Sequence, residues 1–436
     1  MKMNRRRFLL GTTVIGGGLL LGYAVTRPTR QFLANRDHAE AGQTFLTTWL
    51  RIDPDNRVTV VVPHSEMGQG VLTSLPMMAA DEMDADWNLV RVEQAPATDL
   101  FANGVLIKGF AMSMGLSVPA FLDRTVDFAT LKAAEIMNMQ ITGGSSSVRF
   151  TGEMGMRAAG AAAREMLVNA AAAQWNVAAD ECDARNSFVH HDTSGRSASF
   201  GELASAAAEF APPRNPTLKT PDRFTLMGTA VPRVDIPAKV DGSAMFGIDA
   251  MPAGMLYAAV TTAPVFGGKL ARVDNVEAVM QRRGVQRVIE LEDAVAVVAD
   301  NYWRASEALK QLQPVFTDTE FDSSNSSDIF AEFDAALDNN ERNEDVYAGD
   351  AAEALNSAAE TISASYRVPY LAHAAMEPMN CTVHFHDGRC DVWTGTQDNL
   401  GIRGRVASVA DIDANNVTVH PFYLGGGFGR RLPQST

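Results

Sequence analysis

The sequence predicts an α+β (mixed α/β) fold made of several domains, on three observations. At roughly 150 residues per domain, a chain of 436 residues would form about three domains. Its composition of 46% hydrophobic and 20% charged residues is typical of globular proteins large enough to bury a core without disulfides. Apolar runs of strand length also alternate with helical stretches and with loops of small residues.

The first region, residues 45–211, alternates short strands with helices. Its expected elements are strands at 49–52, 57–62 and 90–92, a helix at 72–83, and an alanine-rich helix over about 153–174. The stretch between residues 93 and 141 is expected to be irregular. Glycine-bearing and serine-bearing loops at 64–70 and 142–147 precede the two helices.

Prolines then interrupt regular structure, and residues 212–238 are expected to form a linker. Beyond it the sequence predicts strands at 255–261 and 294–299, a helix at 302–312, and one or two helices with an acidic stretch up to residue 350. The last region predicts a hairpin of residues 381–386 and 389–393 over Asp387-Gly388, a helix at 402–410 and a strand at 417–420.

Charge excludes one class of partner. The chain has 37 basic and 52 acidic residues, for a net charge of −15. Six of the basic residues lie in the first thirty, so the remainder is more acidic still. Such a body repels phosphate backbones, and we expect no nucleic-acid partner.

The N-terminus resembles a twin-arginine export signal. Arg5, Arg6 and Arg7 precede an uncharged run at 8–25 that contains five glycines. The alternative is an ordinary membrane anchor, which the glycines weaken. Residues 1–30 are therefore expected to direct the protein to the periplasm, with an uncleaved membrane tether left open.

Three loops are candidates for binding chemistry: residues 68–70, 143–147 and 425–429. Glycine has no Cβ, so backbone N–H groups can approach an anionic or oxo ligand closely, and successive N–H groups form an anion nest. Each loop by itself could equally be a tight turn or a helix cap. The Gly425–Gly429 sequence is not a G-x-G-x-x-G fingerprint, which disfavours a dinucleotide site.

A metal site held by side chains is not expected. Cys381, His384, His386 and Cys390 are close in sequence, but on a strand the two histidines face away from Cys381. The turn residues explain the hairpin without a metal. The third cysteine, Cys182, is distant, no C-x-x-C pair exists, and no iron–sulfur cluster is expected in this chain. No catalytic role is assigned to Glu66, Glu377 or Asp398, the carboxylates near the loops.

Taken together, the motifs resemble the molybdopterin-binding large subunit of the xanthine oxidase family, in particular its isoquinoline oxidoreductase and aldehyde dehydrogenase beta-subunit group. The resemblance covers residues 45–436. The segments that carry it are 66–70, 142–149, 239–242, 246–249, 373–378, 396–397 and 425–431.

The resemblance implies two halves of a molybdenum-binding domain that flank an a/b hammerhead domain. Residues 45–211 would be the GQG part, 239–320 the hammerhead, and 360–436 the GGGFG part. It also implies a molybdenum–molybdopterin cofactor in the cytosine dinucleotide form. The residues that would hold it are Met67, Gly68, Gln69, Gly70, Gly143, Gly144, Ser145, Ser146, Ser147, Gly426, Gly427, Phe428, Gly429 and Arg430. Gln397 resembles the glutamine beside the apical oxo ligand of molybdenum.

The implied activity is oxidation of an aldehyde or N-heteroaromatic carbon, with water as the oxygen source. Electrons would pass to a separate small 2Fe-2S subunit and from there to a membrane c-type cytochrome. Arg430 and Arg431 replace the Gly-Lys of purine hydroxylases, which disfavours a purine substrate. The general base of the family, a Glu in a Gly-Glu motif, falls beyond this sequence, so we expect a C-terminally truncated and by itself inactive chain. The alternatives are a remnant that binds no cofactor and an exported, tethered ligand-binding protein.

Overall fold

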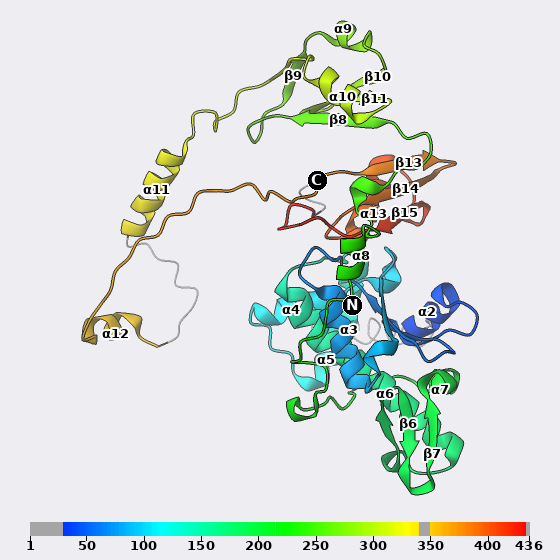
Figure 1. Cartoon of the computed structure of the whole chain (residues 1–436). Helices are drawn as coiled ribbons and strands as arrows, with labels where there is room; N and C mark the ends of the chain where they lie inside the picture. The colour runs from blue at the N-terminus through cyan, green and yellow to red at the C-terminus, as the bar shows by residue number, and fades with distance from the viewer. Residues whose placement is uncertain (1–28, 214, 340–348, 433–436) are drawn as a thin grey trace, which may run out of the picture. The chain divides into compact units, whose positions relative to one another are not determined.

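The computed structural model describes residues 29–213, 215–339 and 349–432, and helices and strands alternate along them (Figure 1). The predicted mixed α/β class is confirmed. The chain divides into two compact units, one of Met1–Ala250 with His373–Thr436 and one of Met251–Ala372. Residues 1–28 of the predicted export signal (1–30) lie outside the described residues. Within the described part, no helix is both long and apolar enough to span a membrane.

The first unit is built on a four-stranded sheet. Strands β1 (Thr44–Thr47), β2 (Leu50–Ile52) and β3 (Val58–Val62) are antiparallel neighbours. Helix α3 (Val71–Met83) then crosses to β4 (Val90–Gln94), which pairs in parallel with β3. The predicted strands and helix are confirmed, and β1 is an additional strand. The loop between β3 and α3 therefore lies at the carboxyl end of a central strand, where α/β sheets commonly bind ligands.

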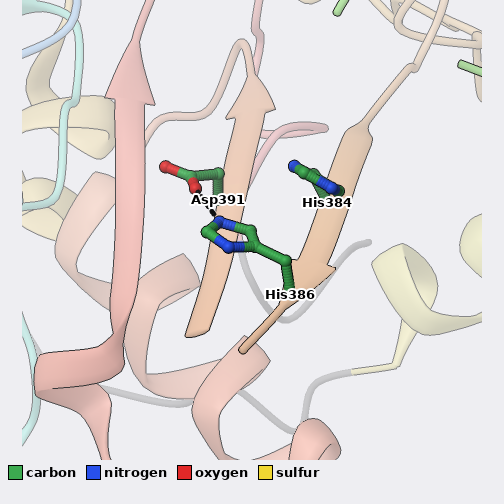
Figure 2. Close-up of side chains that lie close together, drawn as sticks. All are labelled: His384, His386 and Asp391. Atoms are coloured by element: carbon green, nitrogen blue, oxygen red, sulfur yellow. Dashed lines mark hydrogen bonds and ion pairs between the residues drawn. The ribbon is translucent and has the colours of Figure 1, made fainter. Parts of the chain in front are cut away.

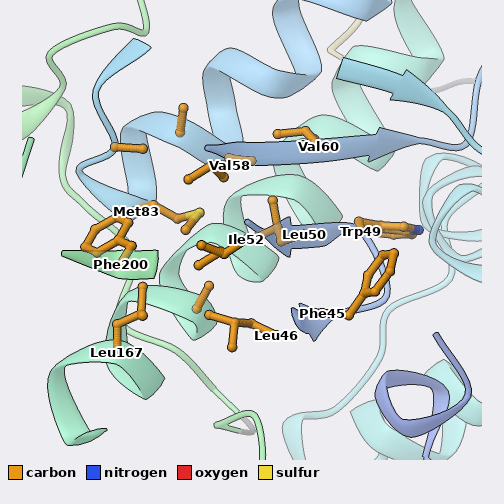
Figure 3. Packing of buried hydrophobic residues seen from close by; sticks show 14 of the residues in the cluster. Phe45, Leu46, Trp49, Leu50, Ile52, Val58, Val60, Met83, Leu167 and Phe200 are labelled. Atoms are coloured by element: carbon orange, nitrogen blue, oxygen red, sulfur yellow. The ribbon is translucent and has the colours of Figure 1, made fainter. Parts of the chain in front are cut away.

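The core of this unit lies between the sheet and its helices (Figure 3). All five residues of β3 are buried. Its four valines cluster with Leu50 and Ile52 of β2, Met83 of α3, and Leu167 of α6 (Arg157–Trp175). Phe200 of α7 (Phe200–Ala207) closes the same cluster. Because β3 is buried on both faces, its position is rigid, and so is the start of the loop that follows it.

The expected irregular structure between residues 93 and 141 is wrong. The structure has helices α4 (Gly104–Ser113) and α5 (Asp123–Ile136) there. The Asn103 side chain caps α4 by accepting from the Leu106 N–H at 3.1 Å. A Cβ on Gly104 would lie 2.6 Å from the Leu131 main chain. Tertiary packing between the two helices supplies what the weak local periodicity did not show.

The alanine-rich helix begins earlier than predicted, and in a different form. Residues Ser147–Met156 are a π-helix, which continues directly into α6. Three glycines allow this composite helix to lie close to α3 and to Trp49. A Cβ on Gly152 would lie 2.5 Å from Met78 Sδ, one on Gly155 2.6 Å from Trp49, and one on Gly160 2.3 Å from the Ala79 carbonyl oxygen. The loop at 142–147 is thus fixed against α3.

Residues 215–235, within the predicted linker, are packed on α3. Lys219 is buried, and its Nζ lies 3.2 Å from Asp81 Oδ1 and 2.6 Å from Asp84 Oδ1.

The remaining elements of this part are α2 (Arg30–His38), a small antiparallel sheet of β5 (Asp183–Arg185), β6 (Phe188–His191) and β7 (Arg196–Ser199), and α8 (Ile236–Asp241).

The last part of the first unit is a three-stranded sheet covered by one helix. Strands β13 (Thr382–His386) and β14 (Arg389–Thr394) form the predicted hairpin, with Asp387 and Gly388 both at positive φ. Helix α13 (Asn399–Ala410) then leads to β15 (Val417–Pro421), which is parallel to β14. Cys390, Val392, Val417 and Val419 form its core. These predictions are confirmed.

The second unit has its own core, in which Val295, Val297 and Leu312 are fully buried. Its strands are β8 (Tyr257–Thr262), β10 (Val285–Glu290) and β11 (Ala294–Ala299) in one sheet, and β9 (Leu270–Val273) with β12 (Pro314–Phe316) in another. Its helices are α9 (Val276–Met280), α10 (Tyr302–Leu309), α11 (Ser326–Asp338) and α12 (Ala351–Ser357). The assignment of residues 239–320 to an a/b hammerhead stays a prediction.

Candidate functional site

The loop between β3 and α3 is organised by Glu66, whose side chain is fully buried. Its Oε1 accepts from the N–H groups of Gly68 (2.9 Å) and Gly70 (3.0 Å), and its Oε2 accepts from the Leu72 N–H (3.1 Å). Arg233 Nη2 lies 3.1 Å from Oε1 and balances the charge. Glu66 therefore shapes the loop and caps α3, as a carboxylate at a helix N-terminus is expected to do.

The Gln69 side chain is used within the same loop. Its Oε1 accepts from the Met67 N–H at 2.7 Å, and its Nε2 donates to the Ser65 carbonyl at 2.9 Å. Both ends of the amide are therefore engaged in holding the loop closed. Gly68 and Gly70 both have positive φ, a conformation that favours glycine.

The loop at 142–147 is attached to the first loop through buried hydroxyl groups. Thr142 Oγ1 accepts from the Ser65 N–H at 2.7 Å. Ser147 Oγ lies 3.3 Å from His64 Nδ1 and donates to the Gly143 carbonyl at 3.0 Å. Burial lowers the pKa of His64 to about 3, so its ring is neutral. The Ser147 hydroxyl thus points into the protein, whereas Gly144 and Ser145 are exposed.

The third loop, residues 425–431, follows β15. Glu377 Oε2 accepts from the Gly425 N–H at 2.9 Å and lies 3.1 Å from Arg431 Nη2. Arg431 is fully buried and also donates to the Glu377 carbonyl at 2.6 Å. Burial lowers the pKa of Arg431, and the Glu377 carboxylate opposes that shift. The loop is therefore fixed by an internal ion pair.

Gln397 joins the second and third loops, since it is buried and lies between them. Its Nε2 donates to the Thr142 carbonyl at 3.0 Å, and its Oε1 accepts from the Gly429 N–H at 3.0 Å. The first loop meets the third where the Leu424 N–H donates to the Glu66 carbonyl at 2.9 Å. A Cβ on Gly427 would lie 2.6 Å from Met67 Sδ and 2.9 Å from Gln397 Oε1. All three sequence-predicted loops are thus brought together.

The assembled loops leave main chain uncovered. A Cβ on Gly68, Gly70, Gly144 or Gly429 would meet no atom within 4 Å. Phe428 is 69% exposed and has a φ of 54°, which is strained for a bulky residue. The open Cβ positions let a large ligand approach the glycine main chain closely, while the N–H groups of Gly68, Gly70 and Gly429 donate inward to Glu66 and Gln397. The donor set fits molybdopterin, because that cofactor carries its own dithiolene sulfurs and needs no protein thiolate.

One further buried carboxylate, Asp398, lies next to the loops, and a cavity between helices lies apart from them. Asp398 is buried next to Gln397, where its Oδ1 accepts from the N–H groups of Gln140 (2.8 Å) and Gly401 (3.0 Å). Burial raises its pKa to about 6. A cavity of about 460 Å³ lies between α4, α5 and α6 and contains none of the loop residues. Hydrogen bonds between the loops define the candidate site, which is separate from that cavity.

Sequence reasoning assigned no role to the residues behind the loops, although His64, Thr142 and the inward-facing Arg431 lie in segments that it singled out. It did not identify Arg233. Glu66 and Glu377 were noticed only as nearby carboxylates. The sequence does show a carboxylate near the first and the third glycine loop. The arginine that each carboxylate pairs with could be identified only from the fold. Arg430, which is adjacent to Arg431, is exposed.

Comparison with known proteins gives matches to both ends of the chain. Models described as molybdopterin cofactor-binding domains match residues 11–117 and 334–436. The beta subunit of isoquinoline 1-oxidoreductase from Brevundimonas diminuta is 31% identical over 88% of this chain and 51% of its own length. The membrane-bound aldehyde dehydrogenase [pyrroloquinoline-quinone] of Gluconacetobacter polyoxogenes is 29% identical over 99% of this chain and 52% of its own.

A third relative, a nicotinate dehydrogenase subunit of Pseudomonas putida, is 24% identical over 88% of this chain and 30% of its own length. The chain spans about half the length of the first two relatives. Both cofactor-domain matches contain candidate loops, namely residues 64–70 and 425–431. The chain belongs to the xanthine oxidase family of molybdopterin-binding large subunits.

Proposed function

We propose that this chain supplies part of the cofactor site of a molybdenum hydroxylase that oxidises an aldehyde or N-heteroaromatic carbon, with water as the oxygen source. The observation that carries the proposal is the Gln397 amide, which ties the Thr142 carbonyl to the Gly429 N–H. It ties the second glycine loop to the third, and the hydrogen bond from the Leu424 N–H to the Glu66 carbonyl attaches the first. The names of the relatives, an isoquinoline oxidoreductase and an aldehyde dehydrogenase, support the substrate class.

When bound, the cofactor would supply the redox chemistry, and the residues of this chain would hold and orient it. The open main chain at Gly68, Gly144 and Gly429 would let its anionic and oxo groups approach closely. Glu66, Glu377 and Gln397 hold the loops in place from behind, so little reorganisation is needed on binding. Met67 and Phe428 would cover its apolar surfaces.

The partners are part of the same proposal. Electrons would leave through a separate 2Fe-2S subunit and then a membrane c-type cytochrome. Two relatives are named as subunits of larger enzymes, which supports a multi-subunit assembly. The sequence has three cysteines, and a 2Fe-2S cluster takes four thiolates. We also propose the cytosine dinucleotide form of the cofactor, and a periplasmic location reached by twin-arginine export.

Cofactor analysis tests the proposal. The full chain, produced with its small subunit in a molybdenum-replete host, should contain about one molybdenum and one pterin, and hydrolysis should release cytidine monophosphate. Pyrroloquinoline quinone is measured in the same sample, because one relative carries it in its name. Background molybdenum and pterin, or stoichiometric pyrroloquinoline quinone, would refute the proposed cofactor.

A substitution connects the cofactor to the loops. Gly144 has open space at its Cβ position and no positive φ, so Gly144→Leu should leave folding intact. If the main chain there contacts the cofactor, the leucine should reduce molybdenum and pterin content severalfold, with little change in melting temperature. Ser205→Leu, on the exposed face of α7, is the matched control and should retain the cofactor. Equal cofactor content in both variants would contradict a binding role for residues 143–147.

A further inference from the structure

A second polar cluster lies on the sheet of β13, β14 and β15, outside the three loops (Figure 2). Asp391 is at its centre. Its Oδ2 lies 2.9 Å from His386 Nε2, and its Oδ1 lies 2.9 Å from His420 Nε2. The His384 ring stacks on the His386 ring with a centroid distance of 4.5 Å. Figure 2 shows the rings of His384 and His386 on one side of the hairpin, together with the Asp391 carboxylate.

Strand register explains why these side chains meet. His384 is the cross-strand partner of Asp391, and His420 is the partner of Trp393, two residues further along β14. Alternate residues of a strand share a face, so His384, His386, Asp391 and His420 all project from the same side of the sheet. One ligand atom from each of His384, His386 and Asp391 lies within 4.8 Å of the others.

We propose that His384, His386 and Asp391 bind a divalent transition-metal ion, with Zn²⁺ as the best fit. Two imidazoles and one carboxylate are donors that Zn²⁺ accepts, and three protein ligands leave a fourth position for water. This metal would be separate from the cofactor and is not required by the proposed function. The proposal revises the sequence-based expectation, which considered the histidines only together with cysteines and left Asp391 out.

Zinc binding at this cluster would require movement of the histidine side chains only. Two donors of one tetrahedral zinc ion lie about 3.4 Å apart, so the ligand atoms must come closer than they are here. His384 is exposed and His386 half-buried, so both rings can rotate without disturbing the core. The ion would replace the hydrogen bond between His386 Nε2 and Asp391 Oδ2.

The surroundings include a positioning residue and opposing charges. His420 holds the second oxygen of Asp391 and stacks on Trp393 at 4.7 Å with an interplanar angle of 4°. It would therefore fix the carboxylate that faces the ion. Asp387 Oδ2, 3.7 Å from His386 Nδ1, adds negative charge, whereas Arg389, the cross-strand partner of His386, adds positive charge.

The test uses the full chain without a polyhistidine tag, stripped with EDTA and titrated with ZnCl₂. We expect one Zn²⁺ per chain in addition to any molybdenum, and a melting temperature that rises with zinc concentration. The double variant His384→Ala/His386→Ala should weaken zinc binding by more than about 100-fold, and His420→Ala should weaken it by about tenfold or more. Both should melt like the parent in EDTA.

His190→Ala, which removes a half-buried histidine on β6, is the matched control and should bind zinc like the parent. Co²⁺ provides a second readout, because a tetrahedral site gives intense visible absorption that the double variant should lose. Zinc binding that is unchanged in the double variant, or absent from the parent chain, would overturn the proposal. Molybdenum and pterin content should be the same in all of these variants, so this outcome is independent of the proposed cofactor.

Discussion

At the scale of single residues, the loops combine strain with buried charge. Phe428 is the clearest strained position, because a bulky side chain at a φ of 54° is unfavourable in the absence of compensation. Its ring is mostly exposed, so packing within the described chain does not explain the strain. Strain of this kind is typical of residues that contact a ligand.

Substitution of Phe428 should reveal this strain. We expect Phe428→Gly to be more stable than Phe428→Ala by about 1 kcal/mol, because only glycine adopts this backbone conformation freely. Urea unfolding of the cofactor-free chain would measure the difference. Equal stability of the two variants would mean that φ at residue 428 relaxes once the ring is removed. Ala374, at a φ of 46°, provides a comparison through Ala374→Gly.

Asp398 should make the folded chain less stable as pH rises. Its pKa is about 6 in the folded protein and 3.8 in the reference state, so the folded state holds the proton longer. Stability therefore falls between about pH 4 and pH 6, by up to about 3 kcal/mol, and stays lower above that range.

Asp398→Asn should remove this part of the pH dependence. Asparagine can still accept the N–H groups of Gln140 and Gly401 and is a good helix cap, but it carries no charge. The stability difference between variant and parent, measured by urea unfolding from pH 4 to pH 7.5, should grow with pH in favour of the variant. Asp398→Ala loses both hydrogen bonds and serves as the control. A difference that is constant with pH would contradict a raised pKa.

At the scale of elements, close helix packing overrides helix propensity. Gly160 lies in the first turn of α6, inside the continuous 147–175 helix, where alanine is intrinsically preferred. The Ala79 carbonyl oxygen, however, is 2.3 Å from the position of its Cβ. The same contact between α3 and the 147–175 helix sets the position of the 142–147 loop.

We therefore expect Gly160→Ala to destabilise the protein by about 1–3 kcal/mol, as is typical for overpacking of a core. Ala173→Gly, at an exposed position of the same helix, should cost only about 1 kcal/mol through propensity alone. Both values come from chemical denaturation. A stabilising effect of Gly160→Ala would show that the two helices can separate without loss, contrary to the packing described above.

At the scale of the whole molecule, the two units have separate hydrophobic cores. Leu50→Ala in the first and Val297→Ala in the second both remove fully buried atoms, at a cost of about 1–5 kcal/mol each. In calorimetry of the full chain, each substitution should lower a different transition. A single transition lowered equally by both would show that the units unfold together.

Much of the architecture could be predicted locally. Strand β11 is a continuous apolar run, and β3 has four valines and one threonine. The Asp387-Gly388 pair specifies its hairpin, and the glycine-rich segments identify all three loops. Helices α4 and α5 could not be predicted, because their periodicity is weak and their stability comes from contacts with each other. The π-helix at 147–156 was missed for the same reason, since its position depends on the packing of its glycines against α3 and Trp49.

The fold class, the three loops and the family that they indicate could all be established from the amino-acid sequence. Glycine content and strand periodicity are local properties of the sequence, so they can be recognised without the folded structure. The groups that hold the loops depend instead on the folded chain: Gln397 between Thr142 and Gly429, Arg431 on Glu377, and Glu66 beneath Gly68 and Gly70. The shared face of His384, His386, Asp391 and His420 depends on it as well. These partners are up to hundreds of residues apart, and burial brings them together because each polar group removed from water needs a counterpart.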